Sequence, residues 1–512
     1  MTNEEVFWQT AASDPDRLAV IVDGGGTSTY GELAETANRL SHGMRVQGLT
    51  SGSVLALVLS NRLELIALQL AAHQIGVYVV PVNRHLTAPE AGYILGDCGA
   101  ELVVADGSTA ATVAEAAKLA GISPEVLYGV GDGAEALRPY EELLGDSSTP
   151  DDRVAGAMLF YSSGTTGRPK GIRRPMSGLS PEAEQARMAQ SARAMSVTRD
   201  GVYLSVGPLY HAAPNQNMMM TLQLGHTVVV SSGFDPEHAL GLIQRHSVTA
   251  TFLVPTMMHR LLTVPAERRN EFDVSSLSTI LHSASICPVA TKRAMIDWVG
   301  PVLVEYYGSS ESGATTLIDS ESWLAHQGSV GKARPGMAVR ICDEHGEELP
   351  PGTPGLIHLK SGVVIEYVGD PDKTAASYQD GFFVPGDIGY LDEDGWLFVC
   401  DRRTDMIVSG GVNIYPAEIE GEVLQHAAVL DAAVFGVPDD EWGQRVVALV
   451  ELHEPDAQRD EVAESILAHC RERLAKFKLP RVLEVVDQLP RTAAGKINRA
   501  RLRDTYQSER AV

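Results

Sequence analysis

Short apolar runs separated by stretches of helical periodicity dominate the first hundred residues of the chain. The runs are Leu18–Asp23, Val54–Ser60, Val77–Val82 and Glu101–Asp106. Strands that alternate with helices are typical of βαβ units, whose strands are parallel. Apolar residues within 63–70 lie on more than one face of a helix, which favours a crossover helix buried against a parallel sheet. The pattern therefore predicts an α/β fold.

The same alternation resumes further along the chain, and each later apolar run ends in small or polar residues. These runs are 155–163, 225–232, 248–255, 278–285 and 301–312. Ligands of α/β proteins bind at the carboxyl ends of parallel strands. We therefore expect a binding site where these runs end.

The character of the sequence changes after about residue 336. Short strand-like segments separated by turn residues predict a small antiparallel sheet or barrel there. About 110 further residues carry strand and helix signals of their own. We expect an N-terminal domain over 1–402, with parallel-rich sheets, helices and a small β-barrel-like subdomain, followed by a small mobile α+β C-terminal domain over 403–512.

The composition narrows the class of protein. A chain of 512 residues exceeds the ~250–300 residues that one hydrophobic core supports, which agrees with two domains. The 44% hydrophobic and 21% charged residues are those of a folded globular protein. A formal net charge of −25 disfavours nucleic acid and anionic lipid surfaces as partners. A few Lys and Arg in a cleft still attract one small phosphorylated ligand.

Cysteine usage and apolar run length bear on the compartment. The five cysteines are scattered, with no CxxC pair and no metal-ligand spacing, which favours a reducing compartment. No run reaches the ~18–20 apolar residues of a membrane span, and the N-terminal residues lack the pattern of a signal peptide. We expect a cytoplasmic protein without integral membrane association. The sequence leaves its oligomeric state open.

A glycine- and hydroxyl-rich loop follows the apolar run that ends at Phe160. The loop, Tyr161–Gly171, reads YSSGTTGRPKG. Glycines let backbone N–H groups wrap an anion, hydroxyls add donors, and a lysine adds charge. A flexible surface turn is the alternative, but such turns rarely combine these features after a buried strand. The pattern predicts a phosphate-binding loop without a Walker A sequence. Its candidate ligands are Ser162, Ser163, Gly164, Thr165, Thr166, Gly167 and Lys170.

This loop resembles the signature loop of the adenylate-forming superfamily, which comprises acyl-CoA and aryl-CoA synthetases, luciferases and the adenylation domains of peptide synthetases. Further motifs of the superfamily follow in the expected order across nearly the whole chain. They are Tyr307–Glu311, Pro385–Asp387, Asp401–Asp405 with Ser409–Gly411, and Pro490–Lys496. The resemblance is closest to bacterial fatty-acid or steroid-type acyl-CoA ligases, which implies a role in lipid and fatty acid metabolism.

The resemblance implies a two-step ligase that uses ATP, Mg²⁺ and coenzyme A. A carboxylate attacks the α-phosphate of ATP to give an acyl-adenylate and pyrophosphate, and a thiol then displaces AMP. Lys496 is the implied catalytic cation, because it can bridge the substrate carboxylate and the α-phosphate as negative charge develops. Glu311 is the implied catalytic and magnesium-binding carboxylate. The alternative for Glu311 is an acid that interacts with a helix N-terminus.

The same resemblance assigns the nucleotide contacts. Tyr307 is the implied adenine-stacking residue, Asp387 the ribose ligand and Arg402 a second ribose or phosphate contact. The alternatives are core packing for Tyr307 and a turn-forming role for Asp387. The other positions assigned to the nucleotide are Ser283, Gly308, Ser309 and Ser310. Two positions depart from the superfamily pattern, because Ser310 stands where threonine is usual and His282–Ile286 where Gly-Gly-Ala-Pro is usual.

His211 and the segment after it indicate the acid-binding side. His211 matches the superfamily's aromatic/His motif, whose side chain lies beside the carboxylate, and it is an implied catalytic residue; the alternative is a structural histidine. Small, amide and thioether side chains fill 212–220, and methionine-rich walls are apolar and adaptable. We expect a hydrophobic carboxylic acid, bound near His211–Met220 with Ser283–Ile286 opposite.

The residues implied for CoA binding lie beyond Arg403. The resemblance places the pantetheine arm beside Gly410 and Gly411, with Trp442 flanking it and Lys478 near the CoA nucleotide. The alternative is a solvated helix end with a packed aromatic residue. Lys496 and these residues cannot all face the nucleotide at once, so we expect the C-terminal domain to rotate about Arg403–Asp405. Within this hinge, Thr404 departs from the Asp or Lys that is common in the superfamily.

These inferences favour a free-standing acyl-CoA synthetase whose ligands are ATP or AMP, a hydrophobic carboxylic acid and CoA. Two alternatives stay open: an enzyme that passes its acyl-AMP to another protein or a carrier thiol, and a non-catalytic nucleotide-binding relative. Lys496 argues against the non-catalytic alternative, because a protein that only binds nucleotide has no need of that charge. The sequence does not name the acid.

Overall fold

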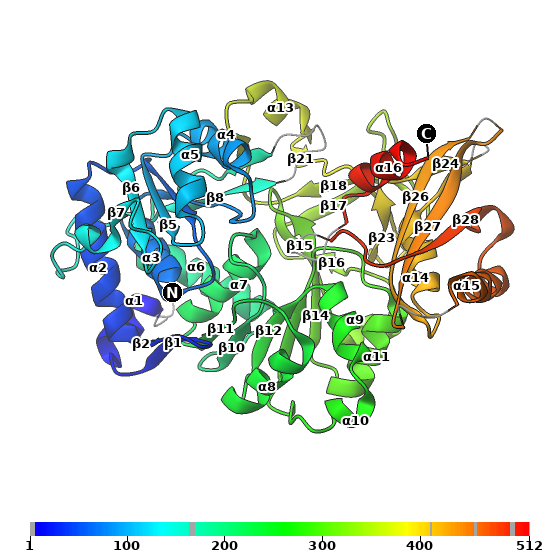
Figure 1. The fold of residues 1–512 in the computed structure, drawn as a ribbon, viewed down its shortest axis with the longest axis horizontal. Helices are drawn as coiled ribbons and strands as arrows, with labels where there is room; N and C mark the ends of the chain where they lie inside the picture. Colours follow the sequence, from blue (N-terminus) through cyan, green and yellow to red (C-terminus); the bar gives the residue numbers. More distant parts are fainter. Residues whose placement is uncertain are drawn as a thin grey trace.

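The computed structural model describes residues 6–162, 169–409, 412–439, 441–454, 458–491 and 497–510. Figure 1 shows two large sheets with their helices at the left and bottom of the view, and the C-terminal elements as a separate group at the right. A smaller sheet lies between them. We call the described residues up to Arg402 the N-terminal body, and the elements after residue 405 the C-terminal elements.

An eight-stranded sheet carries most of the first apolar runs. Its strands lie in the order β19-β9-β8-β4-β3-β5-β6-β7, and the pairs from β8 to β7 are parallel. Helix α3 (Leu63–Gln74) joins β3 to β4 and is mostly buried, as its apolar residues predicted. The strands are β3 (Val54–Val58), β4 (Tyr78–Pro81), β5 (Leu102–Asp106), β6 (Leu127–Val130), β7 (Arg138–Pro139), β8 (Ala157–Ser162), β9 (Lys170–Arg173) and β19 (Glu366–Tyr367). Its other helices are α2 (Tyr30–Val46), α4 (Ala88–Asp97) and α5 (Ala110–Ala120).

A nine-stranded sheet carries the later apolar runs, in the order β16-β15-β14-β13-β12-β10-β11-β1-β2. The pairs from β14 to β1 are parallel. The first apolar run, β1, belongs to this sheet, because it pairs with β11 and turns back into β2. The strands are β1 (Leu18–Val22), β2 (Thr27–Thr29), β10 (Val202–Ser205), β11 (Thr227–Val230), β12 (Ala250–Leu253), β13 (Thr279–His282), β14 (Leu303–Ser309), β15 (Gly313–Asp319) and β16 (Lys332–Ala333). The helices are α1 (Phe7–Ser13), α6 (Pro181–Ala194), α7 (Ala212–Gln223), α8 (Pro236–His246), α9 (Pro255–Thr263), α10 (Ala266–Arg269), α11 (Val289–Val299) and α12 (Ser320–Ala325).

A six-stranded sheet follows, with antiparallel pairing throughout, as the turn-rich segment after residue 336 predicted. Its strands are β17 (Ala338–Cys342), β18 (Gly355–Lys360), β20 (Tyr378–Gln379), β21 (Phe382–Phe383), β22 (Asp387–Leu391) and β23 (Leu397–Arg402), and α13 (Pro371–Ala376) precedes β20. The expected boundary at 402/403 coincides with the end of β23. It stays a prediction.

The C-terminal elements combine a short hairpin, a three-stranded sheet and three helices. They are β24 (Ile407–Ser409), β25 (Val412–Ile414), α14 (Pro416–Val423), β26 (Val429–Asp439), β27 (Gly443–Leu452), α15 (Arg459–Arg473), β28 (Val482–Val486) and α16 (Arg499–Ser508). Separate apolar clusters cover the two faces of the sheet, one built on Val434 and Val450, the other on Phe435 and Val447. The α+β character of this part agrees with the sequence.

The main hydrophobic cluster joins the two large sheets through α2, α3 and α7. Burial of these apolar side chains is the dominant favourable contribution to folding. Among the helices of the described residues, none is both long and apolar enough to cross a bilayer.

A buried ion pair fastens α11 to β14. Lys292 Nζ lies 2.6 Å from Glu305 Oε2, and the two residues are 0% and 4% exposed. His282, the register partner of Glu305 on β13, is also fully buried, with Nε2 3.7 Å from the same carboxylate oxygen. Burial, and then the Lys292 charge, lower the pKa of His282 well below its usual range, so Lys292 is the cation that neutralises Glu305. This cluster lies directly before Ser283 and two residues before Tyr307 in the chain.

Candidate active site

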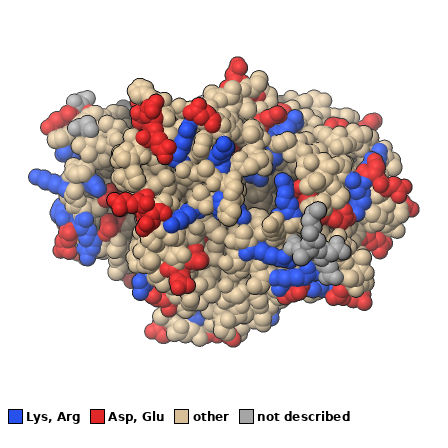
Figure 2. Space-filling model, turned by 180° about the vertical axis from the view of Figure 1, so that it is seen from behind, with Lys and Arg blue, Asp and Glu red and all other residues tan. Residues whose placement is uncertain are grey.

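The carboxyl ends of three parallel strands deliver predicted site residues. β8 ends at Ser162, β13 leads into Ser283, and β14 carries Tyr307 near its end. Figure 2 shows a hollow near the centre of one face with several Lys and Arg side chains around it. Such a concentration of cations in a protein of net charge −25 favours a small anionic ligand.

Three of the residues predicted to bind the nucleotide contact one another. The Tyr307 hydroxyl donates to Asp387 Oδ2 at 2.6 Å, and Arg402 Nε lies 3.4 Å from Asp387 Oδ1. Asp387 and Arg402 are register partners on β22 and β23, so sheet pairing sets their separation. Burial, and then the Asp387 charge, raise the pKa of Tyr307, so the phenol stays protonated and remains a donor. The Asp387 carboxylate retains acceptor capacity for the hydroxyls of a ribose.

A tight turn between β14 and β15 sets the position of Glu311. A Cβ at residue 308 would lie 1.7 Å from the backbone oxygen of Gly313, so this turn needs Gly308. Ser309 Oγ then accepts from the backbone N–H groups of Glu311 and Ser312, each at 3.2 Å. These bonds hold the Glu311 backbone in one place. They also occupy the acceptor side of the Ser309 hydroxyl, a group that the sequence assigned to nucleotide binding.

Glu311 lies among groups suited to a triphosphate. Its Oε1 accepts from the Tyr367 hydroxyl at 3.0 Å, and Lys170 Nζ lies 5.4 Å from the centre of the Tyr367 ring. Burial, and then the neighbouring Lys373, lower the pKa of Lys170 to about 8, while the Glu311 charge acts in the opposite direction. Two lysines and one carboxylate thus share a small region, where an anion would relieve the repulsion between the cations.

The fit to magnesium rests on one carboxylate. The described residues hold no group of three or more His, Cys, Asp and Glu side chains arranged as metal ligands. Mg²⁺ in nucleotide enzymes takes one or two carboxylates together with phosphate oxygens and waters. Glu311 therefore fits a magnesium ion that arrives with a triphosphate, and does not fit a metal site built by the protein alone.

Three residues of this region were missed by sequence reasoning. Arg174 Nη2 donates to the backbone oxygen of Ser310 at 2.9 Å, and Tyr367 and Lys373 lie beside Glu311 and Lys170. A signal existed for Arg174, because residues 170 and 174 point to the same side of an extended segment. No local pattern marks Tyr367, which reaches the site because β19 pairs with β9.

The predicted acid-binding residues lie at and after the start of α7. His211 precedes the helix, and its ring centre lies 4.6 Å from that of Tyr210. Asn217 Nδ2 donates to the Tyr306 hydroxyl at 3.1 Å, which ties α7 to β14. Met218 and Met219 are buried in the main hydrophobic cluster. The predicted acyl pocket therefore shares part of its wall with the core, while Ser283 is buried at the end of β13.

The residues that we expect to bind CoA make contacts with other parts of the C-terminal elements. Lys478 Nζ donates to both oxygens of Glu418, at 2.6 and 2.8 Å. The Arg481 guanidinium lies 5.0 Å from the centre of the Trp442 ring. Of the other predicted site residues, Ser163, Gly164, Thr165, Thr166, Gly167, Gly410, Gly411 and Lys496 lie outside the described residues.

The predicted hinge lies between anchored positions. On its N-terminal side, the backbone N–H of Arg403 donates to the oxygen of Gly386 at 2.9 Å. On its C-terminal side, Asp405 accepts from Arg499 Nη1 at 3.0 Å, and Arg499 also binds Glu420. Thr404 is exposed between them. These contacts hold Arg403 and Asp405 in the orientation described here, and rotation about Arg403–Asp405 stays a prediction.

Comparisons with known proteins agree with this geometry. A family model described as AMP-binding enzyme matches residues 7–366, and one described as AMP-binding enzyme C-terminal domain matches residues 418–496. The chain is 35% identical over 508 residues to a feruloyl-CoA synthase from Amycolatopsis sp, covering 98% of each. It is 32% identical to a fatty acid–[acyl-carrier-protein] ligase from Streptomyces coeruleorubidus, covering 98% and 96%. The structure of o-succinylbenzoate CoA synthetase from Bacillus subtilis, in complex with its acyl-adenylate intermediate, matches with a TM-score of 0.80, 29% identity and 98% coverage of each chain.

Proposed function

The chain belongs to the family of AMP-binding enzymes and is an AMP-forming acid–thiol ligase, and we propose that it joins a hydrophobic carboxylic acid to CoA. In the first half-reaction the acid attacks the α-phosphate of ATP and gives an acyl-adenylate and pyrophosphate. In the second, the CoA thiol displaces AMP. The observation that carries the proposal is the placement of two groups along one segment: the Tyr307–Asp387–Arg402 group at the end of β14, and the Lys170–Glu311–Tyr367 group at the turn that follows β14.

The Tyr307–Asp387–Arg402 group binds the nucleoside. Asp387 accepts from the ribose hydroxyls, and its hydrogen bond from Tyr307 fixes the carboxylate at the end of β14. The Tyr307 ring is then held in one orientation, against which the adenine stacks. Arg402 contributes a cation next to Asp387 at the edge of the site.

The Lys170–Glu311–Tyr367 group binds the phosphates. Adenylyl transfer depends on positioning and on neutralising charge, since the protein forms no covalent bond. Lys170 and Lys373 would neutralise the leaving pyrophosphate, and Glu311 would hold Mg²⁺ together with phosphate oxygens. When bound, this ion neutralises phosphate charge. Lys496 supplies the cation at the α-phosphate, a role that rests on sequence resemblance.

The choice of a hydrophobic acid rests on the surroundings of His211. The start of α7 offers small side chains, and the Met218 and Met219 side chains behind them are apolar. Met-rich walls adapt to bulky apolar ligands. Relatives named for ferulate and for fatty acids support this substrate class.

The experiment that tests the proposal follows pyrophosphate and AMP with a panel of acids, with and without CoA. Pyrophosphate release that depends on the acid, with AMP release that depends on CoA, is the expected result. Acid-dependent pyrophosphate release that needs a carrier protein instead of CoA would favour the second candidate function, transfer to a carrier thiol, which the fatty acid–[acyl-carrier-protein] ligase supports. Nucleotide binding without turnover for any acid would contradict both.

The pKa of Lys170 gives a pH prediction. A lysine binds phosphate as a cation, and burial beside Lys373 lowers the pKa of Lys170 to about 8, so the cation is lost as the pH rises through that value. We expect kcat/KM for ATP, which reports the free enzyme, to fall above about pH 8. In Lys373→Met the repelling charge is gone, and the fall should move to higher pH. The control is the same substitution at an exposed site, Lys118→Met, which should leave the pH profile of the parent protein unchanged. If Lys373→Met also kept the parent profile, Lys170 would not be the titrating cation.

A further inference from the structure

A contact between the N-terminal body and the C-terminal elements joins residues remote in sequence from the hinge. His259 Nε2, on α9, lies 2.9 Å from the backbone oxygen of Leu430, on β26. A carbonyl oxygen only accepts, so Nε2 carries the hydrogen and donates it. Helix α9 buries Met257, Met258 and Leu261 against the core and leaves His259 half-buried on its outer side. The position of α9 is therefore fixed by the core, and β26 is held to it.

The contact continues toward the segment that contains Lys496. Asp431 follows Leu430, and both of its carboxylate oxygens accept from the Arg491 guanidinium, with Nη2 2.6 Å from Oδ1. Arg491 also pairs with Ile497 in an isolated β-bridge. These two are the described residues on either side of 492–496. One continuous chain of contacts thus links α9 to both flanks of that segment.

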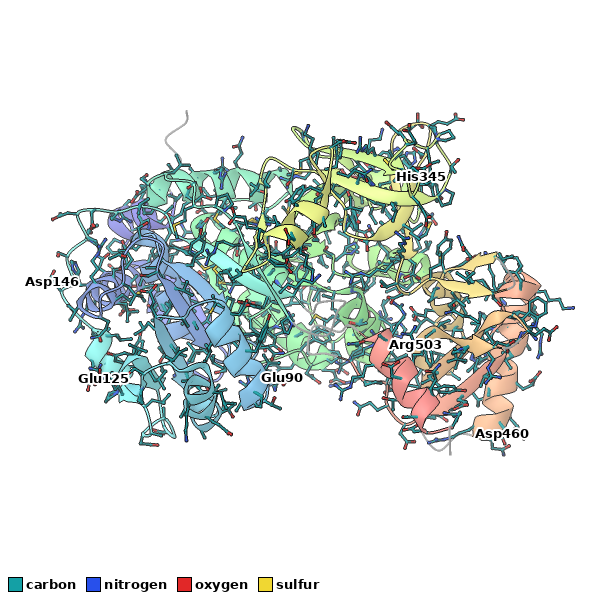
Figure 3. The ribbon with its side chains drawn as sticks, turned by 90° about the horizontal axis from the view of Figure 1, so that it is seen from above. Glu90, Glu125, Asp146, His345, Asp460 and Arg503 are labelled. Carbon is teal, nitrogen blue, oxygen red and sulfur yellow. The ribbon has the colours of Figure 1, made fainter. Side chains whose placement is uncertain are left out.

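The same orientation brings α16 toward the phosphate side of the N-terminal body. α16 begins three residues after Lys496, at Arg499. Hydrogen bonds from the Thr87 backbone and hydroxyl lower the pKa of Glu90 on α4, and the charge of Arg501 on α16 acts in the same direction, so the field of that charge reaches α4. Figure 3 shows Glu90 and Arg503 on elements that face the centre of the molecule from opposite sides. The C-terminal end of α4 accepts a hydrogen bond from Tyr161, the residue that opens the phosphate loop.

The aromatic residues near the predicted CoA site are turned to solvent in this orientation. Trp442 is 38% and Phe477 51% exposed. The orientation described here thus leaves the predicted CoA residues facing outward, as an orientation that serves the first half-reaction would.

We propose that His259 is a positioning residue that holds the C-terminal elements in the orientation that forms the acyl-adenylate. The inference rests on the proposed function, because it presupposes two half-reactions served by two orientations. Rotation about Arg403–Asp405 displaces β26 from α9 and breaks the hydrogen bond to Leu430. The bond therefore stabilises one orientation only, by the net contribution of one hydrogen bond.

The test compares the two half-reactions in single-turnover experiments. His259→Ala should slow acyl-adenylate formation by roughly 2- to 10-fold, the effect of one net hydrogen bond, and leave thioester formation from pre-made acyl-AMP equal or faster. His259→Gln keeps a side-chain N–H donor and should restore most of the first rate. His453→Ala is the matched control, because this exposed imidazole lies near enough for its charge to act on His259. The variant keeps His259 Nε2 as the donor to Leu430.

The ratio of the two rates is the readout that separates positioning from general stability, since a loss of folded protein lowers both rates together. An unchanged ratio in His259→Ala, or the same change in His453→Ala, overturns the proposal. Failure of His259→Gln to restore the ratio does so as well. If the parent protein forms no acyl-adenylate with any acid, it is the proposed function that fails.

Discussion

Replacing Lys496 by alanine is expected to slow acyl-adenylate formation by about 100- to 1,000-fold, the scale of removing one preorganised charge contact from a transition state. Negative charge builds up between the acid and the α-phosphate only in the first half-reaction. Thioester formation from pre-made acyl-AMP and CoA should therefore keep its rate. The measurement is single-turnover kinetics of each half-reaction with the same acid.

The control for this prediction is Lys118→Ala, which removes a lysine from the exposed side of α5 and should change neither rate. Equal losses in both half-reactions of Lys496→Ala would contradict the division of labour between the two orientations. Retention of adenylate formation in that variant would leave Lys170 and Lys373 as the cations that carry the first step. The kinetic split thus tests the role of a residue assigned from sequence resemblance.

Much of the fold follows from the order of apolar runs and helices. The buried crossover helix α3 was predictable because its apolar residues leave no polar face. The sheet to which each strand belongs was not, because pairing is a tertiary property. β1 precedes β3 in the chain, yet it pairs with β11, more than two hundred residues away, in the other large sheet. Periodicity determines what a segment becomes, and long-range packing determines its neighbours.

The candidate site shows the same division. Motif resemblance selected Tyr307, Asp387 and Arg402, and the structure places them within hydrogen-bonding or ion-pairing distance. Their mutual contacts could not be predicted, because they depend on the register of β22 with β23 and on where β14 ends. The place of Tyr367 in the site was even less predictable, since nothing beside it in the sequence marks it. It reaches Glu311 because it lies on β19, a strand of two residues.

The second large expected effect concerns stability and the ion pair beneath this site. Lys292→Met should lower the free energy of unfolding by about 3–5 kcal/mol, because it leaves the Glu305 carboxylate buried without its cation. Replacing both residues, as Lys292→Met with Glu305→Leu, should recover most of this loss, since apolar side chains of similar volume avoid the desolvation of two charges. Urea unfolding followed by tryptophan fluorescence measures both, and the ring of Trp323, whose centre is 4.9 Å from Lys292 Nζ, lies at the substitution.

The pH dependence of Lys292→Met separates an uncompensated charge from lost packing. Burial already raises the pKa of Glu305, and the Lys292 charge opposes that rise, so the pKa rises further in the variant. A group whose folded-state pKa is raised contributes stability below its unfolded pKa and loses it as the pH rises through the folded value. The deficit of Lys292→Met should therefore be smallest in acid and grow toward neutral pH. On the outer side of the same helix, Arg293→Met breaks the exposed pair with Asp297 and should cost less than about 1 kcal/mol. A deficit in Lys292→Met that is independent of pH would show that packing, and not charge, holds α11 against β14.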